Sequence, residues 1–174
     1  MRYIIYRVAM KNTQILLGIV AKAEKVREHD IRVKLLTAEG LKFFTATGAA
    51  KPTAKLKHAI QLFTIAEFSV NGHRITGAHV LQPNHAITKD IKRYYLACAI
   101  AEVVAQCHGA GFLLTVKALD ALNHPERGEP RDIFSEYFSA LLVELGYDCE
   151  ENEDINSAYI RNLDIKIPNT RYFL

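Results

Sequence analysis

The sequence predicts an α+β protein in which an N-terminal five-stranded β-barrel is followed by an α-helical domain. Short runs with apolar residues at alternate positions fill the first half, whereas apolar residues recur every three to four positions in the second. A turn-like break at Gln82, Pro83 and Asn84 separates the two patterns. We therefore expect two domains, residues 1–83 and residues 84–174.

The charge changes sign near the same break. Residues 1–85 contain 13 lysines and arginines against 5 acidic residues, whereas residues 86–174 contain 9 against 14. The net charge of +3 conceals this asymmetry. The basic half suits a polyanionic partner, and the acidic half suits contacts with protein.

Five runs in the basic half have the composition of β-strands, at residues 14–23, 31–35, 41–46, 62–70 and 73–81. In the second run, apolar residues alternate with Arg32 and Lys34, which predicts one buried and one basic face. The same alternation places Phe43 and Phe44 on opposite faces, and it separates Phe63 from Phe68. Residues 1–13 are open to three interpretations: a sixth strand, an arm or a subunit contact.

Two dipeptides predict tight turns between the strands. Glu39-Gly40 connects the second run to the third. Asn71-Gly72 connects the fourth to the fifth and predicts a type I′ hairpin, which needs positive φ at both central residues.

The segment between the third and fourth runs is basic, and its pattern predicts a short helix. Pro52 suits the first position of a helix, and Leu56 and Ile60 lie one turn apart. Its charged and titratable side chains are those of Lys51, Lys55, Lys57 and His58. A five-stranded barrel with a helix between strands three and four is the arrangement of an OB-fold, whose exposed face and loops bind oligonucleotides.

Three helices are expected in the acidic half. The first is capped by Thr88 and runs to about Gln106, and the second covers residues 112–122. The third begins near Pro130 and ends at Gly146 in a left-handed cap. Its apolar stripe consists of Ile133, Phe134, Tyr137, Phe138, Leu141, Leu142 and Leu145. Beyond it we expect an acidic tail at residues 148–154 and a last strand at residues 163–167.

No motif in the chain predicts an enzyme, a cofactor or a metal site. The histidines lie in no nucleophile, zinc-protease or phosphate-loop motif. Cys98 and Cys107 are nine residues apart, about 900° around one helix, so their sulfurs point to opposite faces and cannot share a zinc ion with His108. The acidic residues at 150–154 lack the spacing of a calcium loop.

Without a signal peptide or a long apolar run, we expect a cytoplasmic protein with no membrane partner. Its three cysteines, Cys98, Cys107 and Cys149, are odd in number and widely spaced, which predicts reduced thiols.

Several short motifs carry a resemblance to a known family. They are DIRVKLLTAEG from Asp30, with a turn after Thr37, then TGAAK from Thr47, and a leucine, Leu56, leading into QLFT. The region from Asp30 to Phe68 resembles the N-terminal domain of the RecO family of recombination mediators. The helical half is also similar to that family, from the helix carrying Glu102 to LLVELGYD at residues 141–148.

The resemblance implies a non-enzymatic protein that binds single- and double-stranded DNA through an OB-fold and anneals complementary strands. It further implies partners: the acidic tail of the single-strand-binding protein, and RecR, with which such proteins load recombinase onto DNA.

This chain departs from the family pattern in three ways. Thr47 and Ala50 stand where lysine and arginine are usual, and Leu62 replaces a proline. We expect the chain to lack most of the C-terminal region that carries a four-cysteine zinc site in some members. The first departure moves the expected phosphate contacts to Lys51, Lys55 and Lys57.

We therefore predict an electrostatic track for the DNA backbone, with the helical half as a scaffold for protein docking. The predicted track consists of Arg32, Lys34, Lys42, Lys51, Lys55, Lys57 and Arg74. Two alternatives stay open. An RNA-binding OB-fold module would share all of these features, and an adaptor that docks protein through residues 133–145 and the acidic tail would bind no nucleic acid.

Overall fold

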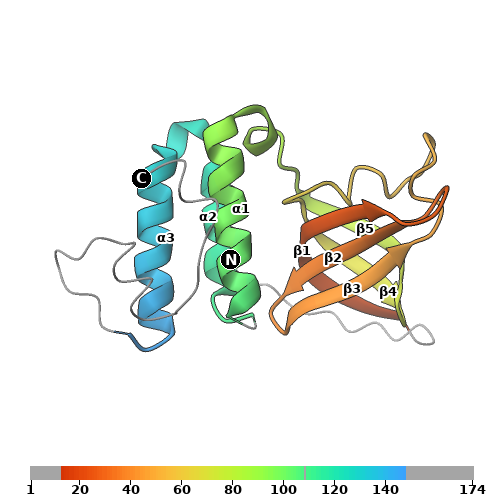
Figure 1. Ribbon diagram of the computed structural model, residues 1–174, viewed down its shortest axis with the longest axis horizontal. Coiled ribbons are helices and arrows are strands. Elements are labelled where there is room, and N and C mark those ends of the chain that lie inside the picture. The colour runs from red at the N-terminus through yellow and green to blue at the C-terminus, as the bar shows by residue number, and fades with distance from the viewer. Residues whose placement is uncertain (1–12, 108, 148–174) are drawn as a thin grey trace. The chain divides into compact units, whose positions relative to one another are not determined.

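A computed structural model describes residues 13–107 and 109–147 of the chain (Figure 1). Within these ranges it contains five strands followed by three α-helices, which confirms the predicted order of the two halves. The chain divides into two compact units that meet in sequence between Pro83 and Asn84, with residues Ala38–Leu41 grouped with the second unit. Each helix within residues 13–107 and 109–147 is too short or too polar to span a lipid bilayer.

The first unit is a closed, OB-fold-like barrel with the strand order β1-β2-β3-β5-β4. The strands are β1 (Thr13–Lys25), β2 (Ile31–Thr37), β3 (Gly40–Ala46), β4 (Ile65–Asn71) and β5 (Arg74–Gln82). The first half of β1 lies antiparallel to β4 and its second half antiparallel to β2. Its register with β2 shifts between Val20 and Lys22, and such a bulge bends a strand. The single strand β1 therefore pairs with two neighbours, β4 and β2, and links them in the barrel.

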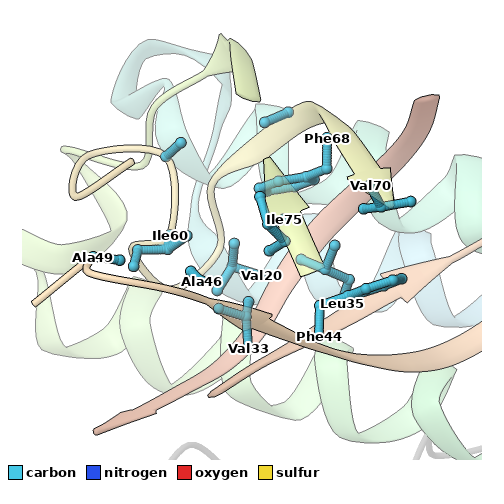
Figure 2. Close-up of a cluster of buried hydrophobic side chains, with 12 residues drawn as sticks. Val20, Val33, Leu35, Phe44, Ala46, Ala49, Ile60, Phe68, Val70 and Ile75 are labelled. Atoms are coloured by element: carbon cyan, nitrogen blue, oxygen red, sulfur yellow. The ribbon is translucent and has the colours of Figure 1, made fainter. Parts of the chain in front are cut away.

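The core of the barrel is built from side chains at alternate positions of the strands (Figure 2). Phe44 points into this core and is 6% exposed, whereas Phe43 next to it is 52% exposed. The predicted separation of these two rings is confirmed, because neighbours in a strand face opposite sides. The cluster comprises Val20, Val33, Leu35, Phe44, Ala46, Ala49, Ala59, Ile60, Ala66, Phe68, Val70 and Ile75.

Residues 47–64, between β3 and β4, form a chain of turns, and the predicted short helix is absent from this part of the structure. The N–H groups of Lys51, Ala54 and Lys57 each donate to the carbonyl oxygen three residues earlier. Ala49, Ala59 and Ile60 from this loop belong to the barrel core, and Figure 2 shows Ala49 and Ile60 near Ala46 and Val20. Packing against the core outweighs the helical preference of so short a segment.

The loop enters β4 through a left-handed residue, so β4 begins at Ile65 and not at residue 62 as predicted. Phe63 has a φ of 62°. Its N–H donates to the Val20 carbonyl at 2.8 Å, and the Val20 N–H donates to the Thr64 carbonyl at 3.1 Å. This kink interrupts the alternation, so Phe63 and Phe68 are both buried and the prediction that they face opposite sides is wrong.

The β4–β5 hairpin forms as predicted, but its turn lies one residue later. Asn71 pairs with Arg74, which leaves Gly72 and His73 as the central residues. Gly72, the first central residue, has a φ of 55°. His73, the second, is not among the residues with positive φ in the described ranges. A positive φ at the first central position alone is typical of a type II′ turn and not of the predicted type I′.

The second unit consists of α1 (Ile91–Gln106), α2 (Phe112–Asn123) and α3 (Pro130–Glu144), with short 3-10 helices η1 (Ile87–Lys89) and η2 (Pro125–Arg127). The three α-helices pack against one another (Figure 1). The α3 stripe is buried as predicted from Ile133 to Leu142. Gly146 has a φ of 82°, and the Gly146 and Tyr147 N–H groups donate to the carbonyls of Val143 and Leu142. These bonds form the predicted left-handed cap.

The N-terminal cap of α1 is Asp90, not Thr88. The Asp90 carboxylate accepts hydrogen bonds from the backbone N–H groups of Lys92 at 2.8 Å and Arg93 at 3.1 Å. The Thr88 hydroxyl instead donates to carbonyl oxygens of the preceding turn at 3.3 Å. The expected acidic tail, the last strand, Cys149, His108 and the N-terminal dozen lie outside the described residues.

Candidate nucleic-acid interface

Outward-pointing side chains of four neighbouring strands form one surface, here called the outer basic face. Strand β2 contributes Arg32 and Lys34, whose neighbours Val33 and Leu35 are fully buried. We define this face by Lys22 and Glu24 on β1, Arg32 and Lys34 on β2, Phe43 on β3 and Arg74 on β5.

The register of β1 and β2 fixes the charges at one side of this face. Lys22 lies opposite Lys34, and Glu24 lies opposite Arg32. Glu24 forms a salt bridge with Lys22. The hydrogen bond that Lys22 donates to Glu24, together with the charges of Lys22, Lys34 and Arg32, holds the pKa of Glu24 below its usual value. Glu24 therefore stays ionised at neutral pH among three cations.

The middle of the face is occupied by an aromatic ring. The Lys34 ammonium nitrogen lies 5.1 Å from the centroid of the Phe43 ring, within the range of a cation–π interaction. At an exposed position such a contact contributes about 0.5–1 kcal/mol. It brings a positive charge of β2 to the exposed ring of β3.

Arg74 extends the same face to β5. It pairs with Thr45 in the parallel bridge between β3 and β5, and the Thr45 N–H donates to the His73 carbonyl at 2.8 Å. Paired residues of neighbouring strands share a face, and Thr45 is two residues from Phe43. Arg74 is exposed while the next residue, Ile75, is buried, so the Arg74 side chain belongs to the outer basic face.

Lys42 does not share this face. It alternates with Phe43 and has the parity of the buried residues Phe44 and Ala46. Its side chain is half-buried. Of the predicted track residues on strands, the structure therefore brings together Arg32, Lys34 and Arg74 and separates Lys42 from them.

The three predicted loop lysines, Lys51, Lys55 and Lys57, are exposed. The start of their loop is tied to the β1–β2 turn, because the Gly48 N–H donates to the Asp30 carboxylate at 2.9 Å and the Ala50 N–H donates to the His29 carbonyl at 3.0 Å. Asp30 immediately precedes β2. The backbone leading to Lys51 thus adjoins the end of the strand that carries Arg32.

Prediction from the sequence missed two members of the outer basic face, Lys22 and Glu24. The alternation of Lys22 and Glu24 with alanines, in the run AKAEK, was the available signal for an exposed charged edge. Their position opposite Lys34 and Arg32 depends on the strand register, which pairs residues far apart in the sequence.

A metal site and reactive thiols are two further features that the described residues could carry. No group of three or more histidine, cysteine, aspartate or glutamate side chains within residues 13–107 and 109–147 is arranged to hold a metal ion. Cys98 and Cys107 are free thiols. Burial raises the pKa of both, which disfavours the thiolate form needed for a nucleophile or a metal ligand.

A closed five-stranded barrel with cations and an exposed ring on its outer face belongs to the class of OB-fold-like modules. Within that class the sequence matches one family model: residues 10–82 match the model described as "Recombination protein O N terminal". The match spans the barrel and confirms the resemblance predicted for this part of the chain, the N-terminal domain of a RecO family member. It suggests a role in recombination or repair. A comparison with curated proteins found no match.

Proposed function

We propose that this protein is a non-enzymatic recombination and repair mediator that binds single- and double-stranded DNA with its barrel. In this proposal it promotes annealing of complementary strands and helps to load recombinase onto DNA coated with single-strand-binding protein. Its partners are DNA, the single-strand-binding protein and a RecR-like protein. The family match over residues 10–82 supports the class of function.

One observation carries the DNA-binding part of the proposal: Arg32, Lys34 and Arg74, from strands distant in sequence, lie on one face around Phe43. Phosphate groups recur along a nucleic-acid strand, so a row of cations across adjacent strands matches them better than the same charges scattered over a surface. Arginine adds bidentate hydrogen bonds to phosphate oxygens.

The loop lysines are the second part of the proposed contact. Their loop begins beside the β1–β2 turn, and the side chains of Lys51, Lys55 and Lys57 are exposed along it. We propose that the outer basic face binds the strand and that the loop lysines add phosphate contacts at one end. Lys42 has no part in this contact.

Two triple variants and one control test the proposal. The first replaces Arg32, Lys34 and Arg74 by alanine, and the second replaces Lys51, Lys55 and Lys57. The control replaces Lys89, Lys92 and Lys117, three exposed lysines of the helical unit, and therefore removes the same charge. Affinities for a labelled single strand and for a duplex are measured at one salt concentration by fluorescence anisotropy.

The first triple is expected to weaken binding to both DNA forms by at least tenfold and the second by a smaller factor, because each lost cation leaves one phosphate unneutralised. The control is expected to stay within about twofold of the wild-type affinity. Equal affinities for all three variants and the wild type would contradict the proposal. An RNA strand of the same length at the same salt concentration separates the proposal from an RNA-binding module.

The mediator role needs a separate assay. Two complementary strands are coated with single-strand-binding protein, and their annealing is followed by energy transfer between end labels. We expect the wild-type chain to accelerate annealing and the first triple variant to lose that effect. Acceleration that is the same with and without the three cations would separate annealing from the outer basic face.

A further inference from the structure

Phe43 is an exposed aromatic ring that phosphate binding leaves unexplained. It lies near the middle of β3 and is 52% exposed, although large apolar side chains usually gain from burial. Its chain neighbour Phe44 already fills the barrel core. The barrel core therefore does not use the Phe43 ring, which remains accessible to a ligand.

The surroundings of the ring show what kind of ligand fits. Lys34 lies over it at 5.1 Å, and Thr45, two residues further along β3, is paired with Arg74. The ring thus has one cation directly over it and a second, Arg74, paired with the residue two positions further along its strand. A peptide that packs by apolar contact needs more area than one ring, whereas a nucleotide combines one flat base with one phosphate.

We infer that Phe43 is a stacking site for one unpaired nucleobase, with the flanking phosphates held by Lys34 and Arg74. This inference rests on the proposed DNA-binding function and names the part of the ligand that the ring contacts. In a duplex the faces of the bases are covered by their neighbours, so only a single strand can use the ring. Phe43 therefore gives the outer basic face a preference for single strands.

The first test compares single-strand and duplex affinities of Phe43→Ala, with Phe43→Tyr as the conservative variant. Loss of one stacked base lowers affinity by roughly five- to 100-fold. We expect Phe43→Ala to lose that factor for a single strand while its duplex affinity stays within about twofold, and Phe43→Tyr to retain the wild-type preference. Phe43→Leu, which keeps an apolar side chain without the ring, repeats the test if the alanine variant unfolds.

The second test uses the absence of tryptophan from the chain. In Phe43→Trp the new indole is the sole tryptophan, and a base stacked on it quenches its fluorescence. Ile15→Trp is the matched control, because Ile15 is 45% exposed on β1 and pairs with Ser69 of β4, away from the outer basic face. Quenching is expected for Phe43→Trp with a single strand, and for neither variant with a duplex.

Three results would overturn the inference: unchanged single-strand affinity in Phe43→Ala, equal losses for single strand and duplex, or unquenched tryptophan in Phe43→Trp under saturating single strand. Failure of the proposed function looks different, because the wild-type chain itself then shows no salt-dependent DNA binding. In that case the stacking inference falls with it.

Discussion

Glu24 shows at the scale of one residue how the outer basic face is tuned. Its carboxylate lies opposite Arg32 and is bound to Lys22, where a phosphate of a bound strand would compete with it. The hydrogen bond from Lys22 and the nearby cations hold the pKa of Glu24 below its usual value, so its carboxylate is negatively charged at neutral pH. In the proposed function, Glu24 therefore repels the negatively charged DNA backbone.

Replacing Glu24 by glutamine is expected to strengthen single-strand binding by about two- to fivefold, because one exposed like-charge repulsion in water is removed. The measurement is anisotropy at low salt. Glu67→Gln, at an exposed position of β4 opposite Leu17 of β1, serves as the control and should not change affinity. An unchanged or weaker affinity in Glu24→Gln would show that Glu24 does not face the bound strand.

Tyr137 provides a second prediction at this scale. Burial raises the pKa of Tyr137 well above 10.0, its value in an exposed chain, while its hydroxyl lies 3.2 Å from the Thr115 hydroxyl. A raised pKa in the folded state stabilises the protein below the unfolded pKa, and this stabilisation is lost as pH rises above it. Between about pH 9 and pH 11 the wild type should therefore lose more stability than Tyr137→Phe. Urea unfolding at both pH values measures the difference, with Tyr147→Phe, an exposed tyrosine, as the control.

Among the elements, α1 shows how a preceding turn decides which residue caps a helix. Thr88 was the predicted cap, and the side chain of Asp90 can cap a helix as well. The η1 turn uses the Thr88 hydroxyl before α1 begins, which leaves Asp90 to accept the first free N–H groups of α1. The choice of cap was decided by the preceding turn.

Asp90→Ala is expected to cost about 1 kcal/mol of unfolding free energy, the usual value of an N-terminal cap. Thr88→Ala should cost less than about 0.5 kcal/mol, because its exposed hydroxyl makes only two long hydrogen bonds. Asp90→Asn keeps an acceptor and should retain most of the stability. A larger loss for Thr88→Ala than for Asp90→Ala would contradict the observed cap.

The β3–β4 loop separates stability from binding in the same segment. Ile60 is 3% exposed in the barrel core, so Ile60→Ala should cost about 2–5 kcal/mol by leaving a cavity. The triple replacement of Lys51, Lys55 and Lys57 should leave the unfolding midpoint nearly unchanged, because exposed lysines contribute little to folding. Chemical unfolding of both variants tests this contrast, and a cost below about 1 kcal/mol for Ile60→Ala would show that the loop does not anchor on the core.

Across the whole molecule, the features that follow from local periodicity were predictable from the sequence. The two faces of β2, the separation of Phe43 from Phe44 and the buried stripe of α3 all follow from a repeat of two or of 3.6 residues. Features that depend on packing were not: the turns at residues 47–64 exist because Ile60 reaches the core, and Phe63 takes a left-handed backbone to return to β1.

Some residues of the outer basic face were likewise predictable from local alternation, whereas others depend on strand register. Alternation identifies Arg32 and Lys34 as exposed, and it could also have excluded Lys42, which has the parity of Phe44. Arg74 belonged to the predicted track because of its charge, but its position on the same face could not be deduced, because the bridge between Thr45 and Arg74 links residues far apart in the chain. Long-range register, not composition, assembles the outer basic face.

The central claim is that the outer basic face holds the backbone of DNA, and the salt dependence of single-strand binding tests it most directly. With about four to six phosphates neutralised, log affinity should fall with log salt at a slope of roughly −3 to −4. Removing Arg32, Lys34 and Arg74 should reduce the magnitude of that slope by about 2, whereas removing Lys89, Lys92 and Lys117 should leave it unchanged. A wild-type slope near zero, or the same slope in all three proteins, would contradict the claim.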